Sequence, residues 1–235
     1  MKISGLQKMT LLDYPGKVAC TVFLGGCNFR CPFCHNSELL GQNAPQFIME
    51  DELFAFLQKR QGLLEAVCIS GGEPTLQPKL SEFISKIKEL NFLVKLDTNG
   101  YRPDVLRKLL EAGLLDYVAM DVKNDLEHYP LTCGLSSMDI NAIQESLSLL
   151  LQGKTEYELR TTVVEQLHNA DSFKGITAML QRLSPEHKCQ KYFLQPFVDR
   201  ETVIYSNFTA PSEERLFEYK KILEQASEIV AIRGL

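Results

Sequence analysis

Two patterns of hydrophobic residues alternate along the chain. Short apolar runs are typical of strands that are buried in a sheet. Between them, apolar residues recur every three or four positions, which is the period of a helix that buries one face. The runs predict strands at residues 18–24, 65–70, 92–96, 117–122, 157–164 and 192–197. This alternation predicts an α/β fold whose parallel sheet is closed or partly closed into a barrel.

Helices are predicted between these strands. Their apolar stripes lie within residues 51–61, 78–90, 104–113, 140–151, 173–183 and 212–226. The expected caps are Ser136 with Asp139 as a capping box, Asp171, and Ser212. A short strand is expected before residue 16, a last strand at 229–232, and a polar loop at 124–134.

Length and composition bound the class of protein. The 235 residues, 45% of them hydrophobic, suit one globular domain over residues 1–235. A net charge of −5 gives no electrostatic case for nucleic acid. No apolar run approaches the roughly 18 residues of a membrane span, and the first residues lack the apolar segment of a signal peptide. We therefore expect a protein of the reducing cytosol, or cytoplasm, that binds small ligands or other proteins.

Three neighbouring cysteines are the first candidate for chemistry. Cys27, Cys31 and Cys34 follow the first long strand at spacings of four and three residues. Thiolates favour iron–sulfur clusters, zinc or copper(I) as partners. A cubane cluster usually takes four cysteines. Three would leave one iron open, and an open iron can hold a substrate or a cofactor.

Two alternatives to an open cluster remain for these three cysteines on the residues alone. A zinc knuckle would need His35 or a distant cysteine as its fourth ligand, and no second ligand pair follows at the usual spacing. A disulfide is disfavoured in a reducing compartment. The remaining cysteines, Cys20, Cys68, Cys133 and Cys189, are scattered along the chain. We interpret them as small buried hydrophobes, except that Cys133 is expected at an exposed loop position.

A glycine-rich turn follows the next strand. Gly71 and Gly72 let backbone groups approach a ligand without interference from a Cβ atom. The neighbouring Glu73 can accept a hydrogen bond from a ligand ammonium group, and Pro74 follows it. Taken alone, this is an ordinary strand-to-helix turn. Polar residues follow several strands, however, and that is where barrel enzymes place their catalytic residues.

Together the two motifs resemble the radical S-adenosylmethionine superfamily. The residues concerned are Cys27-x-x-x-Cys31-x-Phe33-Cys34 and Gly71-Gly72-Glu73-Pro74. Residues 5–40 are similar to activating proteins of anaerobic ribonucleoside-triphosphate reductase, and more broadly to glycyl-radical-enzyme activases. The resemblance implies a partial TIM-like barrel of six strand–helix units, forming a single radical SAM domain.

The resemblance also implies roles for individual residues. Cys27, Cys31 and Cys34 would ligate three irons of a [4Fe–4S] cluster, and the fourth iron would bind the amino and carboxylate groups of S-adenosylmethionine. The glycine-rich turn would bind the methionyl amino group. Phe33 would lie near the adenine, or simply pack within its loop. Thr98 and Asn99 would lie near the ribose or methionine part, or form a plain turn.

Charged residues at strand ends are further candidates. Asp97, Thr98 and Asp121 resemble a monovalent-cation site beside the cofactor in pyruvate formate-lyase activase. Lys123 and Arg160 are candidate partners of the cofactor carboxylate, with buried pairing to Asp121 as the alternative.

Four further polar residues have no firmly assigned role. Gln195 is a candidate polar substitute for a histidine that this activase carries where the present chain has Val198. His128, His168 and His187 are expected at the surface.

The implied reaction is reductive cleavage of S-adenosylmethionine to methionine and a 5′-deoxyadenosyl radical. That radical would take a hydrogen atom from a backbone glycine of a partner reductase, so the cofactors would carry the difficult chemistry. A flavodoxin or ferredoxin would supply the electron. Two alternatives stay open: a radical enzyme acting on a small molecule, such as a deazapurine synthase, and a zinc-binding or redox-sensing interaction module.

Overall fold

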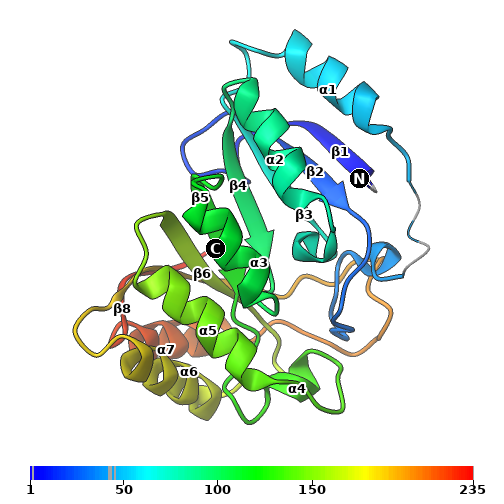
Figure 1. Ribbon diagram of the computed structural model, residues 1–235. Helices are drawn as coiled ribbons and strands as arrows, with labels where there is room; N and C mark the ends of the chain where they lie inside the picture. The colour runs from blue at the N-terminus through cyan, green and yellow to red at the C-terminus, as the bar shows by residue number, and fades with distance from the viewer. Residues whose placement is uncertain (2, 42–43, 45, 235) are drawn as a thin grey trace. The chain divides into compact units, whose positions relative to one another are not determined.

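The computed structural model describes residues 1, 3–41, 44 and 46–234 (Figure 1). These residues form two compact units along the chain. The first comprises Met1–Asn28, Glu38–Thr98 and Asp104–Ala119. The second comprises Phe29–Ser37, Asn99–Pro103 and Met120–Leu235. Each unit has its own strands and helices, and the segment that carries the three neighbouring cysteines is divided between them.

The first unit contains four strands. They are β1 (Ile3–Thr10), β2 (Ala19–Leu24), β3 (Ala66–Gly71) and β4 (Leu93–Thr98). β1 pairs with β2 in antiparallel fashion, and β2, β3 and β4 pair in parallel. The register places Thr21, Cys68 and Lys95 beside one another on successive strands, so that these three side chains share a face. All three are buried.

Helices α1 (Glu50–Lys59), α2 (Leu80–Glu89) and α3 (Pro103–Glu111) accompany these strands. The predicted apolar stripe of α2 is confirmed, because Leu80, Phe83, Ile84 and Ile87 are its buried residues. The stripe follows the helical period, so one face of α2 packs inward while its charged residues point to solvent.

The second unit contains the parallel strands β6 (Glu156–Val163), β7 (Cys189–Pro196) and β8 (Ser227–Ile232). Its helices are α4 (Tyr129–Thr132), α5 (Ile140–Leu151), α6 (Ala170–Leu183) and α7 (Glu213–Leu223). The last two pack side by side in Figure 1, and Phe173 of α6 stacks on Tyr219 of α7 with ring centroids 4.4 Å apart. The predicted last strand and last helix are both confirmed.

Strand β5 (Tyr117–Asp121) spans the division between the units. The described strands form an eight-stranded sheet in chain order, β1 to β8. The predicted α/β class with a mostly parallel sheet is therefore confirmed. Two strands beyond the six strand–helix units, β1 and β8, stand at the two ends of this order.

The segment 124–134 is more than the polar loop that its composition predicts. The short helix α4 forms within it, and Asn124, Tyr129 and Cys133 are fully buried. The expectation that Cys133 is exposed is therefore wrong. His168, expected at the surface, is also buried, with its Nε2 atom 2.8 Å from the Lys123 carbonyl oxygen. Burial lowers the pKa of this imidazole, which favours its neutral form.

Two of the predicted helix caps are wrong. Asp139 itself caps α5, so the helix begins later than a capping box led by Ser136 would place it. Asn169 caps α6, and Asp171 lies in the first helical turn instead. Ser212 caps α7 as predicted. Each actual cap accepts a hydrogen bond from a backbone N–H two or three residues further on.

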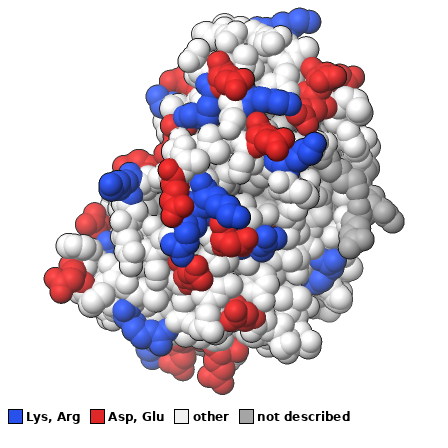
Figure 2. Space-filling model, in the orientation of Figure 1, with Lys and Arg blue, Asp and Glu red and all other residues white. Residues whose placement is uncertain are grey.

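Positive and negative side chains are intermingled on the face of the molecule that Figure 2 shows. That distribution agrees with the modest net charge of −5. Among the described residues, every helix is too short or too polar to cross a bilayer.

Candidate active site

The three neighbouring cysteines differ in exposure from the other four. All seven thiols are reduced, and Cys27, Cys31 and Cys34 are half-buried, whereas the rest are buried. Cys27 belongs to the first unit, and Cys31 and Cys34 belong to the second. The prediction that Cys20 and Cys68 are buried in strands is confirmed, because they lie in β2 and β3.

In the first unit, the glycine-rich turn packs directly on the start of the cysteine segment, residues 25–35. The Gly72 N–H donates to the Leu24 carbonyl at 2.9 Å, and the Glu73 N–H donates to the Gly26 carbonyl at 2.8 Å. A Cβ atom on Gly72 would lie 2.1 Å from the Gly26 oxygen. Gly71 has a φ of +126°, and a Cβ there would lie 2.2 Å from the Leu24 oxygen. Both glycines are therefore required by the approach of the protein's own backbone.

Glu73 is fully buried within the first unit. Its Oε1 atom accepts hydrogen bonds from the Thr75 N–H at 3.1 Å, the Thr75 hydroxyl at 2.5 Å and the Thr98 hydroxyl at 2.8 Å. Pro74 begins the following 3₁₀ turn, where its missing N–H costs nothing. These donors are neutral, and they fix the orientation of the carboxyl group.

Asp97 has a cationic partner that was not predicted from the sequence. Lys95 is only 2% exposed, and its ammonium group pairs with the Asp97 carboxylate on the same strand, β4. A buried lysine is stable when such a partner offsets the cost of removing its charge from water. The signal was present in the sequence, because residues two apart on a strand point to the same face.

Asp121 is the centre of a charged cluster in the second unit. Arg160 and Lys123 both pair with its carboxylate, the latter at 2.9 Å. Burial favours the neutral acid, but the two cations outweigh it and hold the pKa of Asp121 well below its ordinary value. For Lys123, burial opposes the charge and Asp121 more than compensates, so the pKa of the lysine is raised. The alternative interpretation, that these cations pair with Asp121, is what the structure shows.

Cys31 and Cys34 have different surroundings within the second unit. The Cys133 thiol hydrogen-bonds to the Cys31 sulfur, and with help from the nearby Lys123 ammonium it outweighs burial and lowers the pKa of Cys31 to about 7. Burial instead raises the pKa of Cys34. Cys133 had no predicted partner, because no sequence spacing relates it to Cys31.

Phe33 and Asn99 have local structural roles in the second unit. Phe33 is buried in a cluster with Val164 and Phe197, and the Lys123 ammonium lies 6.0 Å from the centre of its ring. The Asn99 side chain accepts a hydrogen bond from the Tyr101 N–H at 3.0 Å, which closes a tight turn after β4. Both arrangements agree with the structural alternatives of loop packing and a plain turn, and the predicted cofactor contacts remain predictions.

Comparison with known proteins shows which family this chain belongs to. A family model described as the radical SAM superfamily matches residues 21–147. The chain is also 32% identical over 245 residues to a Methanocaldococcus jannaschii protein named as a proposed glycyl-radical enzyme activating enzyme, covering 99% of this chain and 96% of that relative. This chain belongs to the radical SAM superfamily.

Two further comparisons extend this assignment. A second Methanocaldococcus jannaschii protein with the same kind of name is 26% identical over 230 residues, covering 94% of this chain and 78% of the relative. A solved structure of TYW1 with a lysine-pyruvate adduct bound has a TM-score of 0.63 at 18% identity, covering 89% of this chain and 74% of that one. At that identity the likeness shows the fold alone, and it confirms the predicted radical SAM type of barrel.

Membership of the radical SAM superfamily implies a [4Fe–4S] cluster and S-adenosylmethionine. The donor chemistry fits the cluster, because three reduced, half-buried thiols lie within eight residues and Lys123 favours the thiolate at one of them. Within the part of the chain that the structure describes, no three His, Cys, Asp or Glu side chains are grouped as a formed metal centre. The identity of the cluster ligands thus remains a prediction from spacing and family.

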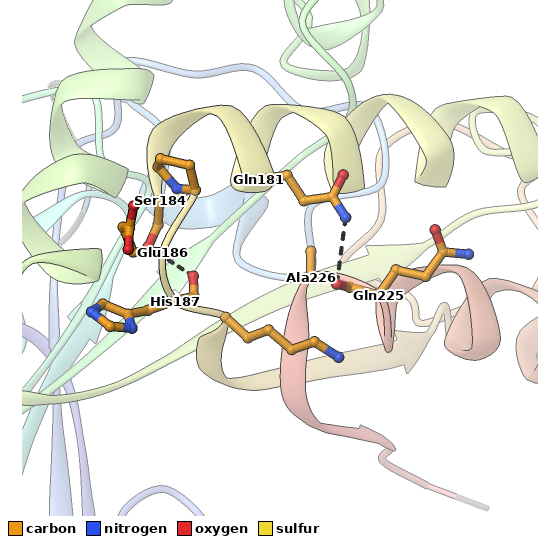
Figure 3. Close-up of a pocket in the computed structure, with 8 residues that line it drawn as sticks. Gln181, Ser184, Glu186, His187, Gln225 and Ala226 are labelled. Carbon is orange, nitrogen blue, oxygen red and sulfur yellow. Dashed lines mark hydrogen bonds between the residues drawn. The ribbon is translucent and has the colours of Figure 1, made fainter.

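A shallow pocket in the second unit contains none of the predicted site residues (Figure 3). It lies between the end of α6 and the start of β7, and Gln181, Ser184 and His187 are among its lining residues. Gln181 donates to the Gln225 carbonyl at 3.4 Å, and the Ser184 hydroxyl donates to the His187 carbonyl at 2.8 Å. These side chains bond to the protein's own backbone, so we assign this pocket no part in radical SAM chemistry.

Proposed function

We propose that this radical SAM enzyme is a glycyl-radical-enzyme activating enzyme. The observation that carries the proposal is its similarity, over nearly the whole of both chains, to a relative named as a proposed enzyme of that kind. The finer proposal is that its partner is an anaerobic ribonucleoside-triphosphate reductase. That step rests on the resemblance of residues 5–40.

Cys27, Cys31 and Cys34 would hold the [4Fe–4S] cluster. Only eight residues include all three thiols, so the segment is short enough for its sulfurs to converge on one cluster. When bound, the cluster and S-adenosylmethionine supply a one-electron reductive cleavage of the sulfonium, chemistry that no side chain of the protein can perform. The protein's contribution is to bind, orient and shield these groups.

Glu73 would receive the methionyl ammonium group of S-adenosylmethionine. Its Oε1 atom is fixed by the three hydrogen bonds from Thr75 and Thr98, and a fixed, buried carboxylate is a strong acceptor for an ammonium donor. Gly71, Gly72 and Pro74 would set the backbone of this turn. The packing of Gly71 and Gly72 on Leu24 and Gly26 supports that role, because it ties the turn to the segment that carries Cys27.

The charged residues would define the electrostatics of the site without a metal cation. Asp97 pairs with Lys95, and Asp121 pairs with Lys123 and Arg160. Because each carboxylate already has a protein counter-ion, our proposal does not require a monovalent cation beside S-adenosylmethionine. Arg160 and Phe33, with Thr98 and Asn99, remain candidate contacts for the carboxylate, adenine and ribose parts of S-adenosylmethionine.

A flavodoxin or a ferredoxin would supply the electron. Among residues 1–235, the cysteines outside the proposed ligand set are buried, and three of them lie inside strands β2, β3 and β7. Buried strand thiols are poorly placed to hold a second cluster. We therefore propose that the electron comes from outside residues 1–235.

A direct test mixes the anaerobically reconstituted protein with S-adenosylmethionine, a reductant and the candidate reductase. We expect a glycyl-radical signal by electron paramagnetic resonance, formed in step with 5′-deoxyadenosine. A matched control uses the reductase with its radical-bearing glycine changed to alanine, which should abolish the signal. A second control uses Cys34→Ala, which should abolish both the signal and the 5′-deoxyadenosine.

Three results would contradict the proposal in different ways. An intact cluster that gives no glycyl radical on the reductase, but does on another glycyl-radical enzyme, would replace the proposed partner. Formation of 5′-deoxyadenosine that depends on a small substrate, and on no protein partner, would favour the small-molecule alternative. One zinc ion per chain and no iron or sulfide after anaerobic purification would favour the interaction module.

A further inference from the structure

Cys133 lies against Cys31, although 102 positions separate them in the sequence. The Cys133 side chain hydrogen-bonds to the Cys31 sulfur within the second unit. Cys133 is fully buried directly after α4, and Cys31 is half-buried in the cysteine segment. Neither the family nor the spacing of the motif assigns a function to this pair of thiols.

The backbone holds the two thiols together independently of their side chains. The Arg30 N–H donates to the Cys133 carbonyl at 2.8 Å. This bond joins the residue directly before Cys31 to Cys133 itself. Gly134, with a φ of +68°, packs so closely that a Cβ atom there would lie 2.1 Å from the Arg30 carbonyl oxygen. A disulfide requires Cα atoms within roughly 7 Å and converging Cβ atoms. Two thiols joined by a hydrogen bond, with their backbones hydrogen-bonded beside them, favour that geometry.

Charged groups of the second unit lie close to the two sulfurs. The Lys123 ammonium interacts with both Cys31 and Cys133, and it is paired with the Asp121 carboxylate, which itself opposes ionisation of Cys31. Tyr129 also faces Cys133, but its buried hydroxyl group is neutral. The two thiols thus lie in contact beside an ion pair of the second unit.

We propose that Cys31 and Cys133 form a reversible disulfide when the protein lacks its cluster and meets a peroxide. Hydrogen peroxide would transfer one oxygen to the Cys31 sulfur, giving a sulfenic acid and one water molecule. The Cys133 sulfur would then attack the Cys31 sulfur, forming the S–S bond and releasing the oxygen as a second water. Two thiols lose two electrons and two protons, and one peroxide is reduced. A dithiol reductant would restore both thiols by exchange.

Other pairs of cysteines are less well placed to form a disulfide. Cys20 in β2 is level with Val67, whereas Cys68 is level with Thr21, so Cys20 and Cys68 point to opposite faces of the sheet. Cys189 is buried at the start of β7 beside Ser227. Within the cysteine segment, the Cys34 N–H donates to the Cys31 carbonyl at 3.1 Å, making Cys34 the local competitor.

The disulfide would act as a redox switch on cluster loading. This consequence, unlike the disulfide itself, rests on the proposed function, because it requires Cys31 to be a cluster ligand. Oxidation would withhold that ligand, so the protein could not rebuild its cluster until a dithiol reductant acted. Residual thiols at Cys27 and Cys34 would be too few to replace it.

The test begins with metal-free, fully reduced protein. The protein is treated with one equivalent of hydrogen peroxide, its remaining thiols are alkylated under denaturing conditions, and the linked peptides are mapped by mass spectrometry. We expect one main linkage, Cys31–Cys133, and its loss on treatment with dithiothreitol. A main linkage from Cys31 to Cys34 or Cys27, or a Cys133 that is still fully alkylated, would overturn the proposal.

Variants separate the disulfide from effects on folding. Cys133→Ser should abolish the linkage, whereas the matched control Cys189→Ser should keep it. The wild-type map stands without either variant if Cys133→Ser fails to fold. Peroxide-treated wild-type protein should then take up little iron and sulfide until reduced, and Cys133→Ser should take up more. Linkage without any such block would overturn the switch, and a reduced protein that builds no cluster at all would instead refute the proposed function.

Discussion

The thiols buried in strands and the thiols of the cysteine segment show how far one chemical group can differ within one protein. Burial raises the pKa of Cys20 in β2 to about 12 and that of Cys189 in β7 to about 11. Burial opposes ionisation of Cys31 as well, but the Cys133 hydrogen bond and Lys123 reverse the outcome and lower its pKa to about 7. For Cys31 the neighbours outweigh burial, and this separates it from the inert packing thiols of the strands.

The largest expected contrast concerns metal content. Cys34→Ala should abolish the cluster, because a cubane with two protein ligands does not assemble stably. Cys189→Ala should leave iron and sulfide at the wild-type content, since Cys189 is a buried packing residue. Both are measured by metal and sulfide analysis after anaerobic reconstitution. If Cys189→Ala lost the cluster while remaining folded, the distinction between the two groups of cysteines would be wrong.

The next contrast is in chemical reactivity. In reduced, metal-free protein at pH 7, Cys31 should alkylate on the order of 10³ times or more faster than Cys189, because far more of it is thiolate. Its rate should rise as the pH increases through about 7 and level off above, since the pKa is lowered from 9.0 to about 7. Iodoacetamide labelling followed by peptide mass spectrometry measures both. Equal rates for Cys31 and Cys34 would contradict the contrast, because burial raises the pKa of Cys34.

The contrast can be sharpened by removing one neighbour. Lys123→Met should shift the pH midpoint of Cys31 alkylation upward, because the ammonium no longer favours the thiolate. The variant should also lose about 1–3 kcal/mol of stability, since Asp121 loses one of its two buried partners. The matched control is Lys174→Met, which removes an exposed lysine paired with Asp171. A midpoint that stays unchanged in Lys123→Met would remove the lysine from the explanation.

The smallest effect is expected in the strands. Cys20→Ala should cost about 1 kcal/mol of unfolding free energy, because a small buried side chain is removed from β2. Cys20→Ser should cost more, about 1–3 kcal/mol, if its buried hydroxyl finds no partner as good as water. Urea denaturation measures both. A Cys20→Ser variant as stable as Cys20→Ala would show that this strand position tolerates polarity.

The fold was largely predictable because its signals are local. The apolar runs and the helical stripes specify buried strands and one-sided helices within short stretches of chain, and Ser212 caps its helix as expected. Predictions failed where two polar residues compete for one local role. Asn169 rather than Asp171 caps α6, and both types of side chain suit that position. Helix α4 was missed because four residues, Tyr129–Thr132, are too few to show a period.

The candidate site, like the fold, combines features that local sequence predicted with contacts that it did not. The cysteine spacing and the Gly71–Pro74 turn are local, and they were enough to predict the family that comparison then confirmed. The contacts of Cys133 with Cys31, and of His168 with the Lys123 carbonyl, join residues far apart in sequence. Only the folded chain shows such pairs. Lys95 is the exception, because its pairing with Asp97 could have been predicted from their positions on one strand.

The cysteine segment is tied to its surroundings on both flanks of Cys27. The Gly26 N–H donates to the Leu39 carbonyl at 2.7 Å within the first unit, and the Arg30 N–H donates to the Cys133 carbonyl within the second. A backbone ordered in advance loses little conformational entropy when it takes up a ligand. Loading iron and sulfide should therefore leave amide-exchange protection at residues 26 and 30 nearly unchanged.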